Sequence, residues 1–194
     1  MANRSSATVL PAPDDDLCLA YANTRYWRGT PAPTEELNGP DDLWRWVRSV
    51  ARLPPLLLDR IGSSNLIFDD AIRLRETIHR CFAATAGGRQ PPDDDLVALN
   101  AVLALAPPRR RLRVGGWEIG TPDPSGSVLL APTLWSAADL LVGTRLQRVR
   151  QCANPECGWL FLDGSKSGNR RWCSMSACGN RAKAHRHYQK QKQK

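Results

Sequence analysis

Four cysteines in the last quarter of the chain constrain its fold more than any other feature. Cys152 and Cys157 form one pair and Cys173 and Cys178 the other, with four residues inside each pair and fifteen between the pairs. Zinc binds thiolates tetrahedrally, and a structural zinc site normally takes all four ligands from the protein. Two disulfides or unrelated core cysteines are the alternatives, and the symmetric spacing disfavours both. The pattern therefore predicts one structural zinc ion held by these four thiolates.

The N-terminal part carries no apolar run of the length of a signal peptide or a membrane span. We therefore expect a cytoplasmic protein without membrane contact, in which cysteines are reduced or bound to metal. The other two cysteines, Cys18 and Cys81, fall inside apolar helical patterns, and we expect them to be small buried side chains.

Charge is divided unevenly along the chain. Residues 145–194 contain 12 Lys and Arg against only Glu156 and Asp163, whereas residues 1–144 contain 15 Arg, 17 Asp and Glu, and no lysine. This difference predicts a near-neutral domain over residues 1–144, called the body below, and a basic zinc domain over residues 145–194, called the finger. A compact basic segment of this kind is typical of proteins that bind polyanions.

The body is expected to be mainly helical, with one small β-hairpin, so that the whole chain is predicted to be α+β. Apolar residues recur at steps of three and four over several segments, which end at proline or glycine pairs. Around Gly115-Gly116 the period changes to two, which predicts a hairpin with these glycines as its turn. The expected helices cover residues 14–27, 41–53, 64–86, 93 to about 106, and 134–142.

The finger is expected to follow the order of a treble-clef zinc finger. A strand over residues 146–151 leads to Cys152, a tight turn at 154–156 separates the first two ligands, and a second strand covers 159–162. A loop over 163–168 and a basic segment then lead to Cys173. Ser174 or Ser176 is expected to cap the terminal helix, which places Cys178 in its first turn, where the helix dipole favours the thiolate.

Two stretches of the chain resemble known families. The segment from Arg148 to Ala184, with Cys178-Gly179-Asn180-Arg181 near its end, closely resembles the CGNR zinc finger. The body resembles the ABATE domain at residues 17–24 and in the Leu74-Arg75-Glu76 helix, although Ala20 stands where that family commonly has an acidic residue. The resemblance implies an α/β body that precedes a DNA-binding finger, in bacterial proteins described as stress-induced transcription regulators.

The terminal helix is expected to have two different sides. Arg181 falls on the side of Cys178, which predicts that it braces the finger, and Asn180 is expected to help orient the thiolates. The other side carries lysine and arginine, as does the loop before Cys173, and we expect phosphate contacts there. The predicted nucleic-acid contacts are Lys166, Arg170, Arg171, Lys183, Arg186 and Lys190.

Three functions are compatible with the sequence. The first is a transcription regulator whose finger binds DNA while the body senses a small-molecule effector or forms a homodimer. The second is a module that docks on RNA or protein, with Trp159 and Trp172 available to stack on unpaired bases. The third, an enzyme housed in the body, is disfavoured because the sequence contains no arrangement of nucleophile and base, and four cysteine ligands leave zinc no open position.

Overall fold

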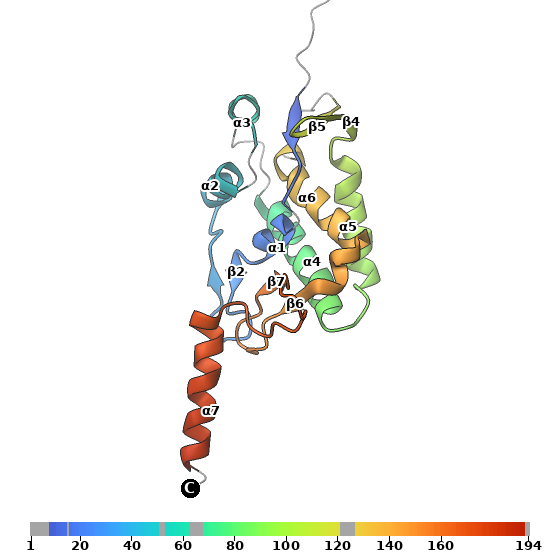
Figure 1. The fold of residues 1–194 in the computed structure, drawn as a ribbon. Coiled ribbons are helices and arrows are strands. Elements are labelled where there is room, and N and C mark those ends of the chain that lie inside the picture. Colours follow the sequence, from blue (N-terminus) through green and yellow to red (C-terminus); the bar gives the residue numbers. More distant parts are fainter. Residues whose placement is uncertain (1–7, 15, 51–52, 63–67, 121–126, 193–194) are drawn as a thin grey trace, which may run out of the picture.

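The computed structural model describes residues 8–14, 16–50, 53–62, 68–120 and 127–192, and it combines helices with three small antiparallel sheets, as expected for the α+β class. No helix in these ranges is long and apolar enough to cross a membrane. Figure 1 shows the helices of the body above the finger. The helices of the body are α1 (Leu17–Ala22), α2 (Pro40–Val50), α3 (Pro55–Ile61), α4 (Phe68–Ala86), α5 (Asp93–Leu105) and α6 (Ser127–Val142).

Helix α4 lies at the centre of the body. It packs against α1 and α5, and α6 closes the core by contacting α1 and α5 in turn. The expected apolar stripe is buried along α4, including Leu74, Ile78 and Phe82. Cys18 and Cys81 are buried as predicted, and burial raises the pKa of the Cys81 thiol to about 11. These two cysteines therefore stay protonated and serve as core side chains.

Helix α1 is much shorter than the predicted helix over residues 14–27. It ends at Ala22, after which β2 (Arg25–Tyr26) pairs with β3 (Thr34–Glu35), and Trp27 adopts a φ of 54°. The segment remains apolar past Ala22 because Tyr26 and Trp27 pack on the finger instead of on the body's core. A pattern of apolar residues reports burial, and here the burial is against a different part of the chain.

The hairpin lies one residue earlier than predicted. Strands β4 (Arg109–Arg113) and β5 (Gly116–Ile119) leave Val114 and Gly115 as the turn, and β1 (Val9–Pro11) pairs with the other edge of β5. Gly115, the second residue of this turn, has a φ of 85°, a conformation that glycine adopts without steric cost. Gly116 serves a different purpose, because a Cβ atom there would lie 2.1 Å from the carbonyl oxygen of Leu10 in β1.

The finger begins with a 3-10 turn and a two-stranded sheet that share the core of the body. Val149 and Leu160, from the two strands, belong to the same cluster of buried residues as the helices. Figure 1 shows α7 leaving the finger and pointing away from the body. The elements are a 3-10 helix (Thr144–Arg148), β6 (Val149–Gln151), β7 (Leu160–Leu162), a π-helical turn η3 (Met175–Gly179) and α7 (Asn180–Lys192).

Candidate metal centre and its basic surroundings

The four predicted ligands meet in one place. The sulfur atoms of Cys152, Cys157, Cys173 and Cys178 all lie within 4.8 Å of one another, and those of Cys157 and Cys173 are 3.8 Å apart. A tetrahedral site with Zn–S bonds of about 2.3 Å places its sulfur atoms about 3.8 Å apart, so the cluster has the size that zinc requires. Cys152, Cys157 and Cys178 are buried and Cys173 is partly exposed. Four thiolates leave no open coordination position, which makes the site structural.

The protein alone does not provide the charge needed to ionise all four thiols. Burial raises the pKa of Cys157 to about 12 and also raises that of Cys173 well above its usual value. Burial acts in the same direction on Cys152, but hydrogen bonds from the backbone of Cys173 and Asn154 outweigh it and lower the pKa. Zinc binds thiolates, and its own charge supplies the missing stabilisation. The donor set therefore fits one zinc ion.

Two nearby residues organise the ligands. Ser174 accepts a hydrogen bond from the amide of Ala177 at the start of η3, so it caps the helical segment that carries Cys178, as expected. The side-chain amide of Asn154 lies 3.7 Å from the sulfur of Cys178. Asn154, predicted only as a residue of the turn, also forms that turn by accepting hydrogen bonds from the amides of Glu156 and Cys157. Asn180, expected to orient the thiolates, is exposed at the start of α7.

Arg181 contacts the body. Its guanidinium carbon lies 4.5 Å from the centre of the Trp27 ring, and that ring in turn packs against the cysteine cluster. A guanidinium over the face of tryptophan is a favourable cation–π pair. This contact supports the predicted bracing role of Arg181, and its partner is Trp27, the last residue of the predicted helix over residues 14–27.

The basic loop before Cys173 is held in shape by Asp163. This carboxylate is only 2% exposed and accepts hydrogen bonds from the amides of Ser165 and Arg170. Hydrogen bonds from Ser165 lower the pKa of Asp163 to about 2, so it stays ionised. Arg148 and Arg150 donate to the carbonyls of Ser165 and Gly168 in the same loop. The carboxylate of Asp163 therefore makes its hydrogen bonds inside the finger. Glu156 is the finger's one exposed acidic residue.

The predicted nucleic-acid contacts of this loop fall into two kinds. Lys166 and Arg171 are exposed, and Arg171 lies over the ring of Trp172 at 5.4 Å. Arg170 is also exposed but already has partners, since it donates to the carbonyls of Trp172 and Cys173 and lies 4.5 Å from the ring of Phe161. These bonds give Arg170 a structural use within the finger.

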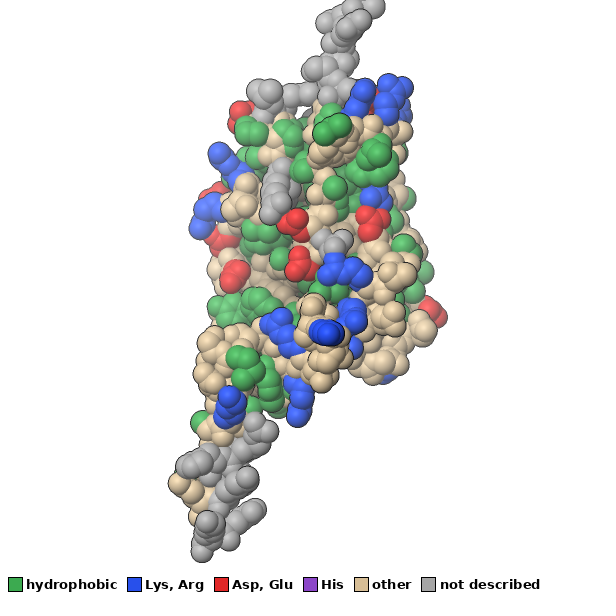
Figure 2. Space-filling view, viewed as in Figure 1, with side chains coloured by type: hydrophobic (Ala, Val, Ile, Leu, Met, Phe, Trp, Pro, Cys, Tyr) green, Lys and Arg blue, Asp and Glu red, His purple; other side chains and the backbone are tan. Residues whose placement is uncertain are grey.

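The contacts predicted on the terminal helix are only partly described. Lys183 is exposed on α7. The side chains of Arg186 and Lys190 lie outside the described part of the structure, although the backbone of α7 continues through both positions. Figure 2 shows Lys and Arg side chains gathering around the finger near the start of α7, with acidic side chains seen mainly higher up, over the body.

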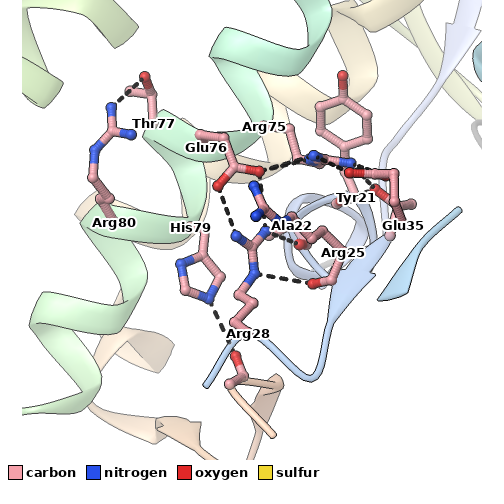
Figure 3. A network of polar contacts seen from close by, with 12 residues as sticks. Tyr21, Ala22, Arg25, Arg28, Glu35, Arg75, Glu76, Thr77, His79 and Arg80 are labelled. Atoms are coloured by element: carbon pink, nitrogen blue, oxygen red, sulfur yellow. Dashed lines mark hydrogen bonds and ion pairs between the residues drawn. The ribbon is translucent and has the colours of Figure 1, made fainter. Parts of the chain in front are cut away.

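A network of charged residues in the body reaches the metal centre. Arg75 is 1% exposed and bonds to both Glu35 and Glu76, and Glu76 also receives a hydrogen bond of 2.6 Å from Arg28 (Figure 3). Burial alone would raise the pKa of Glu76, but the bonds and charges of the two arginines outweigh it and lower that pKa. Glu76 is therefore ionised, and the positive charges of the two arginines in this network are balanced by the negative charges of the two glutamates.

His79 lies beside this network and contacts the finger. Its Nε2 atom is 3.1 Å from the carbonyl oxygen of Gly158, which can only accept, so Nε2 carries the proton. Burial, with Arg28 nearby, lowers the pKa of His79 to about 4, and the ring is neutral near pH 7. Residues 28 and 79 both belong to the body, whereas residue 158 belongs to the finger. Neither lies in a pattern that could reveal a contact with residue 158.

Comparison with protein families matches both parts of the chain in order. The model of the ABATE family, described as "Putative stress-induced transcription regulator", matches residues 15–144, and that of the CGNR zinc finger matches residues 148–191. Neither description is that of an enzyme. A search of curated proteins found no match. The chain therefore belongs to the ABATE family, and it ends in a CGNR zinc finger whose four cysteines fit one structural zinc ion.

Proposed function

We propose that this protein is a DNA-binding transcription regulator in which the finger contacts DNA and the body senses an effector or forms a homodimer. In this regulator the body (1–144) and the finger (145–194) have different roles, and neither is catalytic. The observation that carries it is the unbalanced positive charge of the finger. Asp163 is buried in internal hydrogen bonds, so Lys166, Arg171 and Lys183 face solvent with little acidic surface beside them.

The position of α7 supports contact with a duplex. The helix starts at the metal centre and extends away from the body, and a helix of 13 residues is about 20 Å long. The major groove of DNA admits a helix of ordinary width. Contacts of lysine and arginine with phosphates provide affinity and register without reading the sequence.

The tryptophans of the finger favour a duplex over unpaired bases. Trp159 packs edge-on against Tyr26 at 5.8 Å, and Trp172 lies below Arg171. Both also pack on the cysteine cluster. Stacking on bases requires a free aromatic face, and these contacts use the rings within the protein. We therefore expect the protein to bind duplex DNA more tightly than single-stranded RNA, and the two affinities can be compared directly.

The test measures duplex binding at several salt concentrations for the zinc-loaded protein. Lys183→Ala and Arg171→Ala should each weaken binding to all sequences alike and reduce the slope of log affinity against log salt by about one, because each removes one phosphate contact. Arg186→Ala should behave in the same way. Arg45→Ala, which removes an exposed charge from α2, is the matched control and should leave the slope unchanged.

Zinc content is checked in each variant, because loss of the metal would weaken binding for another reason. Unchanged affinity and slope in zinc-loaded Lys183→Ala and Arg171→Ala would contradict DNA binding through this surface. Tighter binding to single-stranded RNA than to duplex DNA at the same salt concentration would favour the RNA-docking alternative.

A further inference from the structure

The body supplies donors to three consecutive carbonyl groups beside the metal ligand Cys157. The amide of Gly29 donates to the carbonyl of Glu156 at 3.2 Å, and the amide of Arg28 donates to the carbonyl of Cys157 at 3.4 Å. The ring of His79 donates to the carbonyl of Gly158 at 3.1 Å. The backbone on both sides of this ligand is therefore held from outside the finger.

Two glycines allow the body and the finger to approach this closely. A Cβ atom on Gly29 would lie 2.1 Å from the carbonyl oxygen of Pro155, which leaves no room for any other residue. Gly158 has a φ of 71°, and a Cβ atom there would lie 2.9 Å from the Cβ atom of Arg28. One glycine belongs to the body and the other to the finger, so the contact depends on a feature of each part.

Charged residues of the body fix the donors in place. The guanidinium of Arg28 bonds to Glu76 and to the carbonyls of Ala22 and Arg25, which sets the course of the chain just before Gly29 (Figure 3). Figure 3 also shows the ring of His79 beside Arg28, on the same helix as Glu76, with its bond directed at the carbonyl in the finger. The amide of Arg28, through the bond of its side chain to Glu76, and the ring of His79 therefore both depend on α4.

We propose that the body forms the outer part of the zinc site, with His79 and Arg28 as positioning residues for the Cys157 ligand. Groups that hold metal ligands in the bound geometry lower the cost of ordering them, and removing such a group typically weakens metal binding by about 10- to 100-fold. The zinc affinity of the finger is accordingly set in part by residues 75–79 of α4 and by the chain around Arg28.

A consequence is that zinc and the fold of the body stabilise each other. Binding free energies are linked reciprocally, so contacts that strengthen zinc binding also allow zinc to stabilise the body. A change in the body that displaces Arg28 or α4 would therefore weaken zinc binding without touching a ligand.

The test compares variants of His79 in the full-length protein. His79→Ala should bind zinc about tenfold more weakly, measured by competition with a chelator of known affinity. His79→Gln, whose amide can reach the same carbonyl, should retain most of the affinity. Arg73→Ala, an exposed residue of the same helix, is the control and should match the wild type. His79→Asn, with a shorter amide, should behave like His79→Ala and serves as the second variant if alanine prevents folding.

A second measurement separates positioning from ordinary packing. Thermal unfolding is followed with zinc bound and after chelation, and tenfold weaker binding should reduce the stabilisation by zinc by about 1.4 kcal/mol. The absorption of the cobalt-substituted protein should still report four thiolate ligands. Equal destabilisation of the loaded and chelated forms would overturn the proposal, as would wild-type zinc affinity in His79→Ala or equal losses in His79→Ala and His79→Gln.

Discussion

Replacing Asn23 should destabilise the whole protein, because this side chain joins the body to the finger. Its amide nitrogen donates to the carbonyl of Leu160 at 2.8 Å, and its oxygen accepts from the amide of Leu160 at 2.9 Å. Asn23 is 5% exposed and Leu160 is 1% exposed, so water does not replace these bonds in the folded protein. Asn23→Ala leaves two buried backbone groups without partners.

The size of the effect follows from those two groups. Each buried polar group without a partner costs about 1–3 kcal/mol, so Asn23→Ala should lower the free energy of unfolding by about 2–6 kcal/mol. Many proteins have a total stability of only about 5–15 kcal/mol, which makes this a large fraction. For a chain of this length each kcal/mol lowers Tm by about 2–4 °C. Asn23→Asp keeps an acceptor but loses the donor, and its carboxylate faces a carbonyl, so it should not restore stability.

The assay is chemical unfolding of the zinc-loaded protein, followed by far-UV circular dichroism for the helices and by tryptophan fluorescence. Asn38→Ala is the control, because Asn38 is exposed and its hydrogen bonds can be replaced by water. A loss below about 1 kcal/mol for Asn23→Ala would refute the reasoning, since the cost of two buried groups without partners could not be that small. Separate transitions of body and finger in the wild type would show that β7 is not part of a shared core.

Two further predictions concern the metal and its brace. The purified protein should contain about one zinc ion per chain. Cys173→Ser should release this ion and also lower the thermal stability of the body, because the finger shares the body's core. If metal analysis finds no zinc in protein prepared without chelator, this prediction is wrong. Arg181→Ala should weaken zinc retention or finger stability more than it changes the salt dependence of DNA binding, because it loses the contact with Trp27. A variant with full thermal stability but altered sequence preference would instead make Arg181 a base-reading residue.

Much of the metal centre could be predicted from the sequence because its signals are local or chemically restrictive. Few residue types bind zinc, and two cysteine pairs with equal spacing leave little choice of ligands. Two other features were predictable for the same reason. Ser174 caps the helical segment that contains Cys178, and α4 carries a long apolar stripe, and each feature depends on residues only a few positions apart. The strong positive charge of residues 145–194 is also a property of composition alone.

The tertiary structure decided what the local patterns leave open. Tyr26 and Trp27 lie in the segment predicted as helix, but they pack against Trp159 and Arg181, more than a hundred positions away, and the helix ends at Ala22. The sequence around Gly29 indicates only a turn, whereas in the structure the carbonyl oxygen of Pro155 occupies the space that a side chain at Gly29 would need. Sequence patterns along one segment determine which residues are buried and which can bind metal. The partner of each buried group depends on which distant segments meet, and here that meeting places His79 and Arg28 beside the zinc ligands.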